Sequence, residues 1–301
     1  MTTFGFEAEF HDNVAPLMAG LHARGLTATD EMHSYHCRCE MCDFETGGVF
    51  RGQHDSSCGG EVISHVFSTD NMDEAVSAMT SLQAVAVDVD AEPSLAAGFH
   101  VHIGNAEFGR DRYALADAMW AYLRWEGWLG TVASGRWPEV RGFNVSNRSI
   151  LSGCGAYEAG EAGWGSDEWG ESGFTFNGPD CIQQAEEEFS DAGLAQVKRF
   201  AYHWIGGDEE RHLWLNLQTR NRKTWEFRLW NSTRVAWRME LFSRLSALFL
   251  NKDAAPELLA TTPNDKAMLS IAGSLDSELA GLLERQLACA RTREPFTTVP
   301  G

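Results

Sequence analysis

The stretch that decides the fold is Thr2-Thr3-Phe4-Gly5-Phe6-Glu7-Ala8-Glu9-Phe10. Its apolar and charged residues alternate strictly, which is the pattern of a β-strand with one buried face. Glu7 and Glu9 then share the opposite face. The sequence therefore predicts a first strand that presents two carboxylates on one side and packs its apolar residues on the other.

Elements of both kinds follow this strand, so the expected class is α+β. The hydrophobic periodicity predicts helices over residues 12–24, 73–83, 110–129 and 235–250, strands over residues 60–68, 84–89 and 98–104, two successive strands within 210–230, and a last helix or broken pair over 265–290. We expect a curved, mainly antiparallel sheet with helices on one face. Asn231-Ser232-Thr233 is the expected N-cap of the helix over 235–250.

We expect one domain over residues 1–301. It would contain an irregular Cys- and His-rich excursion at residues 30–60, an acidic insert rich in Gly and Trp at 130–191, and a helical segment at 251–301.

The charge balance excludes some partners. Lys and Arg number 24, Asp and Glu number 43, and the formal net charge is −19. Bulk binding of nucleic acid needs a basic surface, so we expect none. No stretch is long and apolar enough to predict a membrane span. The N-terminal residues lack the pattern of a signal peptide, so we expect a cytoplasmic protein. The sequence leaves the oligomeric state open.

Several predicted strands carry a polar pair opposite an apolar row. The pairs are Glu7 with Glu9, His100 with His102, His212 with Asn216, and Glu226 with Arg228. One sheet with helices on its apolar side would gather these side chains on the other side. Carboxylates from several strands suit Mg²⁺ or Mn²⁺, and an imidazole can complete the shell. An arginine beside them suits phosphate.

These residues resemble the amidoligases of bacteria and phages, within the carboxylate-amine ligases that share the fold of glutamine synthetase and glutamate-cysteine ligase. The resemblance rests on four motifs in order: Phe4-Gly5-Phe6-Glu7-Ala8-Glu9; Asp55-Ser56-Ser57 with Glu61-Val62-Ile63-Ser64; Gly98-Phe99-His100-Val101-His102; and Thr224-Trp225-Glu226-Phe227-Arg228-Leu229 with Asn231-Ser232-Thr233. It covers roughly residues 1–250. It departs from the family where Asp55-Ser56-Ser57-Cys58 replaces the usual Asp-Gly-Ser, and in the long acidic insert after Gly130.

The resemblance implies ATP-dependent joining of a small-molecule or peptide carboxylate to an amine through an acyl phosphate. It implies that Mg²⁺ or Mn²⁺ is held by Glu7, Glu9, Asp55, Glu61, His102 and Glu226. Arg228, Glu226 and Asp55 are the expected catalytic residues. The residues expected to contact ATP are Arg228, His100, His212, Asn216 and Arg211.

The cysteines at residues 37–58 form a second feature. Cys37, Cys39 and Cys42 lie within six residues, and Cys58 follows downstream. This spacing permits either a tetrahedral Zn²⁺ site or free thiols in a reducing compartment.

Two other functions compete with the ligase. His100, His102 and Glu107 match the first half of a cupin metal motif, which would indicate a metal-dependent oxygenase or hydrolase, although the helical pattern after residue 110 argues against it. A zinc-organised interaction module built on residues 30–60 is the non-enzymatic alternative. Taken singly, Glu7 with Glu9 is also typical of a solvated sheet face, and Glu226 with Arg228 of a structural ion pair.

Overall fold

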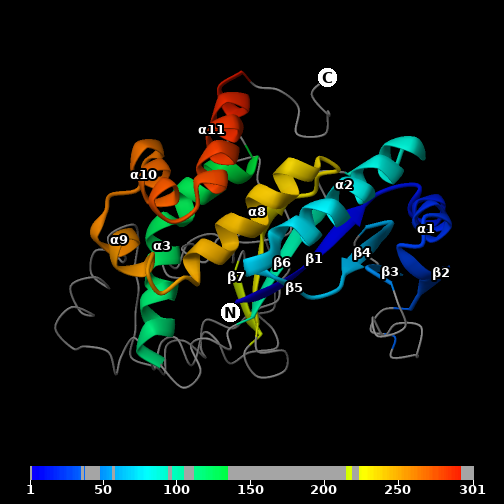
Figure 1. Ribbon diagram of the computed structural model, residues 1–301, viewed down its shortest axis with the longest axis horizontal. Coiled ribbons are helices and arrows are strands. Elements are labelled where there is room, and N and C mark those ends of the chain that lie inside the picture. Colours follow the sequence, from blue (N-terminus) through cyan, green and yellow to red (C-terminus); the bar gives the residue numbers. More distant parts are fainter. Residues whose placement is uncertain are drawn as a thin grey trace, which may run out of the picture.

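The computed structural model describes residues 2–34, 37, 48–55, 58–93, 97–104, 112–134, 215–218 and 224–292. These residues form an α+β fold around a mixed, mostly antiparallel, open sheet (Figure 1). The predicted class is therefore confirmed.

The sheet runs in the order β2-β3-β4-β1-β6-β8-β7, with β5 also paired to β1. Its strands are β1 (Thr3–Phe10), β2 (Thr27–His33), β3 (Phe50–Gln53), β4 (Gly60–Ser64), β5 (Phe67–Ser68), β6 (Gly98–Gly104), β7 (Leu215–Gln218) and β8 (Thr224–Asn231). The pair β2–β3 is parallel and the other pairs are antiparallel. The strand β1 is thus enclosed by neighbours on both edges.

Helices pack on the apolar face of the sheet and on one another. They are α1 (Val14–Ala23), α2 (Met72–Asp88), α3 (Arg112–Ser134), α8 (Ala236–Phe249), α9 (Ala255–Ala260), α10 (Asp265–Leu275) and α11 (Ser277–Thr292), and a short 3₁₀ helix spans Thr69–Asn71. Figure 1 shows α2 and α8 lying side by side across the sheet, and α8 contacts β1 and β6. Phe99 of β6 packs against Phe242 of α8, and Phe227 of β8 against Tyr122 of α3. The opposite face of these strands is left for polar side chains.

A β-bulge in β8 sets which side chains face the helices. Phe99 pairs with Trp230 and Val101 with Phe227, so His100 alone stands opposite both Arg228 and Leu229. Without the extra residue, strict alternation would place Trp230 on the face of Glu226 and Arg228. The bulge returns Trp230 to the helical side, where it stacks on Phe242 with ring centroids 4.6 Å apart.

Two predicted elements are wrong. The alternation of residues 84–89 predicts a strand, but α2 continues to Asp88 because its buried residues keep the helical period through Leu82, Val85 and Ala86. Val85 is 1% exposed and Val87 is 46% exposed, whereas a strand would place both on one face. Asn231-Ser232-Thr233 does not cap α8 either. The N-cap is Val235, and Gln83 accepts the hydrogen bond of the Ala236 N–H.

The described residues of the excursion at 30–60 include two strands that were not predicted. Its first part belongs to β2, and Phe50–Gln53 forms β3, which pairs with β4 inside the sheet. The C-terminal helices occur as a broken pair, α10 and α11, separated at Asp276. Residues 135–214, which include most of the predicted acidic insert, lie outside the described residues.

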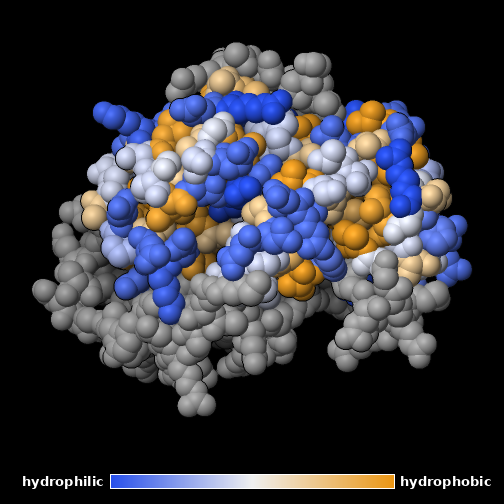
Figure 2. Space-filling model, in the orientation of Figure 1, coloured by the Kyte–Doolittle hydropathy of each residue, from blue (hydrophilic) through white to orange (hydrophobic). Residues whose placement is uncertain are grey.

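Among the described residues, the exposed large hydrophobic side chains are Val66, Val87 and Leu275. In the view of Figure 2, hydrophobic residues occur in separate groups between hydrophilic ones. Among the described residues, none of the helices has the length and apolar character needed to cross a membrane.

Trp230 gives a test of this packing. We expect Trp230→Ala to lower the free energy of unfolding by about 3–5 kcal/mol, because it removes a fully buried ring and leaves a cavity against Phe242. Urea titration followed by circular dichroism measures the change. Val66→Ala, at a residue 67% exposed, should change it by less than about 0.5 kcal/mol. Equal effects of the two substitutions would contradict this packing.

Candidate metal and phosphate site

Glu7 and Glu9 lie near the middle of the sheet. In the register of the strands, Glu7 stands beside His100 of β6, and Glu9 beside Glu61 of β4. Paired residues of antiparallel strands point to the same face, so these side chains converge. Glu9 is 1% exposed, and the side chain of Glu7 is 14% exposed.

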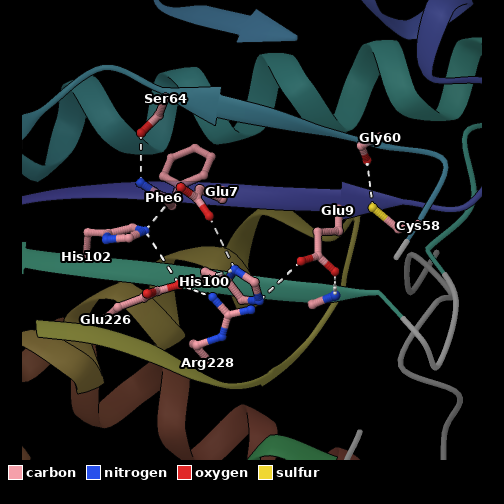
Figure 3. A network of polar contacts seen from close by, with 11 residues as sticks. Phe6, Glu7, Glu9, Cys58, Gly60, Ser64, His100, His102, Glu226 and Arg228 are labelled. Carbon is pink, nitrogen blue, oxygen red and sulfur yellow. Dashed lines mark hydrogen bonds and ion pairs between the residues drawn. The ribbon is translucent and has the colours of Figure 1, made fainter. Parts of the chain in front are cut away.

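His100 occupies the centre of the network (Figure 3). Its Nδ1 lies 3.3 Å from a carboxylate oxygen of Glu7 and 3.6 Å from one of Glu226. Its Nε2 lies 3.3 Å from a carboxylate oxygen of Glu9. One imidazole therefore contacts carboxylates from β1 and β8, and its side chain is only 2% exposed.

His102 joins Glu7 and Glu226 in a first group of potential metal ligands. The ligand atoms of these three residues all lie within 4.8 Å of one another. His102 Nε2 is 3.2 Å from Glu7 and 3.9 Å from Glu226. Burial acts to raise the pKa of Glu7, but His102 and His100 outweigh it and hold that pKa well below its usual value. Glu7 is therefore a carboxylate at neutral pH.

Arg228 forms an ion pair with Glu226 at the edge of this group. Burial opposes the charge of both residues. For Glu226 the pairing with Arg228 prevails and its pKa is lowered. For Arg228 the attraction of Glu226, Glu7 and Glu9 prevails and its pKa is raised. The side chain of Arg228 is 18% exposed, so most of it is buried in the polar face.

A second group consists of Glu9, Asp55 and Glu61, with ligand atoms again within 4.8 Å of one another. Burial raises the pKa of Glu61 to about 9, and the neighbouring charges of Glu7, Asp55 and Glu9 add to the rise more than Arg228 reduces it. This group thus carries more negative charge than its cationic neighbours balance.

Backbone contacts fix the two glutamates of β1. The N–H of Gly98 donates a 2.7 Å hydrogen bond to the Glu9 carboxylate, and the Ser232 hydroxyl donates to the Glu9 carbonyl oxygen. The Ser64 hydroxyl accepts a 2.9 Å hydrogen bond from the N–H of Phe6, next to Glu7. The first bond restricts the orientation of the Glu9 carboxylate, and the other two hold the backbone of β1 in place beside both glutamates.

The cysteine prediction is tested only in part, because Cys39 and Cys42 lie outside the described residues. Cys58 donates to the carbonyl oxygen of Gly60, and burial together with Glu9 and Asp55 raises its pKa to about 12. Such a thiol is not a preformed thiolate ligand. Within the described part of the chain, no group of potential metal ligands includes Cys37 or Cys58.

The described part of the chain brings together eight of the predicted site residues, which are Glu7, Glu9, Asp55, Glu61, His100, His102, Glu226 and Arg228. Asn216 lies in β7 opposite Glu226, whereas Arg211, His212 and Glu107 lie outside the described residues. Arg51 and Gln53 of β3 belong to the same face but were not expected, because the segment around them was predicted to be irregular. The sequence carries only the brief alternation Phe50-Arg51-Gly52-Gln53 at these positions, and four residues are too few to predict a strand.

The donor set suits hard divalent cations. The first group offers two carboxylates and an imidazole, and the second offers three carboxylates, which are ligands that Mg²⁺ and Mn²⁺ accept. The raised pKa of Glu61 is a cost of gathering these carboxylates. A cation bound beside Glu61 would relieve that repulsion, so the residues fit a metal centre.

The sequence matches no known family profile. No curated protein matches it either.

Glu61 gives a pH-dependent test of this site without metal. Between its ordinary pKa of 4.5 and the folded value of about 9, the folded chain binds a proton that the unfolded chain does not. The free energy of unfolding should therefore fall as pH rises through this window, by about 1.4 kcal/mol for each unit of pKa difference. In the presence of a chelator, we expect Glu61→Gln to be more stable than the native chain at pH 8.5 and equally stable near pH 4.5.

Chemical denaturation at several pH values measures this difference. Glu74→Gln is the matched control. Glu74 lies on α2, its side chain is 54% exposed, and its nearest charged partner is His65. With millimolar Mn²⁺ the native chain should become more stable than Glu61→Gln, since the cation stabilises the folded chain that binds it. A stability difference that is independent of pH would argue against the buried, crowded carboxylate.

Proposed function

We propose that this protein is an ATP-dependent carboxylate-amine ligase that uses Mg²⁺ or Mn²⁺. The observation that carries the proposal is the adjacency of the two ligand groups, Glu7-His102-Glu226 and Glu9-Asp55-Glu61, with Arg228 ion-paired at their edge. Two cation sites next to a guanidinium are the parts that phosphoryl transfer requires.

The proposed roles follow from position. Glu7, His102 and Glu226 would hold one cation, and Glu9, Asp55 and Glu61 the other. When bound, the cations would neutralise the phosphates of ATP and the charge that develops during transfer. His100 contacts carboxylates of both groups and would keep Glu7 and Glu9 oriented.

Arg228 is the proposed phosphate-binding residue. Its guanidinium combines a fixed positive charge with forked donors, which match phosphate oxygens. Its ion pair with Glu226 fixes the position of the guanidinium beside the first group of ligands. The backbone of Asn216 pairs with Glu226 in the neighbouring strand, and we propose Asn216 as a further contact of the nucleotide.

The proposed reaction has two steps. A carboxylate oxygen of the acid attacks the γ-phosphorus of ATP, ADP leaves, and an acyl phosphate forms. The amine nitrogen then attacks the acyl carbon, phosphate leaves, and the nitrogen loses a proton to give the amide. Both steps gain mainly from positioning and from neutralised charge.

The resemblance to amidoligases supports this proposal through the same positions. Each of its four motifs places a residue in one of the two ligand groups. The α+β fold with a mostly antiparallel sheet is compatible with a fold like that of glutamine synthetase, which we propose for this chain.

The test is ADP release with ATP, Mg²⁺ and a panel of acids and amines. We expect Glu7→Gln and Glu226→Gln each to lower kcat by at least about a hundredfold, because each removes a ligand charge from the first group. Circular dichroism should show that both variants remain folded. Glu74→Gln, outside the site, should retain full activity.

Full turnover in both ligand variants would refute the metal assignment. A native chain that releases no ADP with any acid and amine of the panel would refute the ligase.

Arg228→Lys separates charge from geometry. Lysine keeps the positive charge but loses the forked donors, so we expect the KM for ATP to rise about tenfold or more. The KM for the amine should change little. Steady-state kinetics with each substrate varied in turn measures both constants, and an unchanged KM for ATP would remove Arg228 from phosphate binding.

A further inference from the structure

We propose that the side-chain oxygen of Gln53 is a further ligand of the second cation, beside Glu9, Asp55 and Glu61. Gln53 would add a neutral oxygen to three carboxylates. This inference rests on the second cation site of the proposed function, but not on the ligase reaction that the site would serve.

Gln53 lies on the polar face of the sheet, at the end of β3. Its neighbour Gly52 faces α1, since a Cβ added to Gly52 would lie 2.7 Å from Met18 Cγ. Successive residues of a strand face opposite sides, so Gln53 points away from α1. Gln53 pairs directly with Glu61 of β4, which places both side chains on one face with their Cβ atoms about 5 Å apart.

Asp55 flanks Gln53 along the chain. The segment after β3 stays paired with β2, because the His54 N–H donates a 2.8 Å hydrogen bond to the carbonyl oxygen of His33. Residues two apart in an extended chain share a face. Gln53 therefore stands next to Asp55 and Glu61, two of the three carboxylates whose ligand atoms lie within 4.8 Å of one another.

The amide of Gln53 is held in one orientation. Its Nε2 donates a 3.1 Å hydrogen bond to the carbonyl oxygen of Ser34, the residue after β2. The Oε1 atom lies on the other arm of the planar amide and so points away from Ser34. Among the described residues, no hydrogen-bond donor contacts this oxygen, although Gln53 is only 5% exposed. A buried acceptor that lacks a donor is unfavourable, so this position favours a bound ligand.

The neighbouring charges select a cation as that ligand. Carboxylates and an amide oxygen are all acceptors, so only a hydrogen-bond donor or a metal ion can lie favourably between them. The raised pKa of Glu61 shows that these carboxylates repel one another, which favours a divalent ion over a neutral donor. Amide oxygens of Asn and Gln are ordinary ligands of hard cations, and they add no further repulsion.

Binding of Mn²⁺ alone tests the proposal without ATP or turnover. The electron paramagnetic resonance signal of free Mn²⁺ gives the number of bound ions and their Kd values. Two backgrounds separate the sites, since Glu226→Gln weakens the first group and Glu61→Gln weakens the second. In the Glu226→Gln background, we expect Gln53→Met to raise the Kd of the remaining site by about tenfold or more, because a ligand is lost. In the Glu61→Gln background, Gln53→Met should change the Kd by less than about twofold.

Gln53→Glu distinguishes a ligand from a structural residue. Both substitutions remove the hydrogen bond to Ser34, but a glutamate keeps a side-chain oxygen at this position. In the Glu226→Gln background, Gln53→Glu should therefore bind Mn²⁺ at least as tightly as its parent. Gln83→Met is the matched control, because Gln83 lies on α2 and accepts its hydrogen bond from the Ala236 N–H, on the helical side. Gln53→Ala replaces Gln53→Met if that variant does not fold.

Three results would overturn the proposal, and they have different meanings. An unchanged Kd for Gln53→Met in the Glu226→Gln background would remove Gln53 from the ligands and leave the second site in place. Weakened binding in both Gln53→Met and Gln53→Glu would give Gln53 a structural role through Ser34. A native chain that binds fewer than two ions would refute the second cation site itself, whereas the ligase reaction is decided separately by ADP release.

Discussion

The polar face depends on carboxylates that are held in a strand paired on both edges. Glu7 and Glu9 cannot move away from each other, because β1 is fixed between β4 and β6. Each carboxylate loses most of its hydration, which costs several kcal/mol unless charges or hydrogen bonds replace the water. The neighbours supply these: His100 contacts both glutamates, and the Gly98 N–H donates to Glu9. At Glu61 these contacts do not make up for the lost hydration and for the repulsion of the neighbouring carboxylates, and its pKa is raised. This uncompensated negative charge is the physical reason to expect bound cations.

Much of this arrangement can be predicted from the sequence, because apolar and polar residues alternate along the strands with a period of two. The alternations Phe6-Glu7-Ala8-Glu9 and Phe99-His100-Val101-His102 identify one apolar and one polar face, and one face per strand is enough to gather the polar residues in space. The described residues confirm that polar side chains of several strands gather on one face. The glutamates of β1 lie there beside His100, His102, Glu226 and Arg228.

The errors arise where local pattern and tertiary packing disagree. Residues 84–89 alternate like a strand, yet α2 buries Val85 and exposes Val87 because the helix already packs along α8. Strand β3 is only four residues long, which is too short for a periodicity signal. Its pairing with β4 depends on the tertiary structure and cannot be predicted from the local sequence. The bulge at Arg228 and Leu229 is likewise invisible in composition, since only the partner strand reveals the extra residue.

The ladder between β6 and β8 has a consequence for how this architecture can vary. Gly104 and Thr224 pair directly, so the chain between them begins and ends at neighbouring points of one sheet. The entropy of closing such a segment grows only with the logarithm of its length, about 0.6 kcal/mol per doubling. Helix α3 and strand β7 also lie between these anchor points and pack on the same sheet. Insertions or deletions outside these two elements would therefore leave His102 and Glu226 in register, so the ligand groups can stay the same while the length of this segment changes.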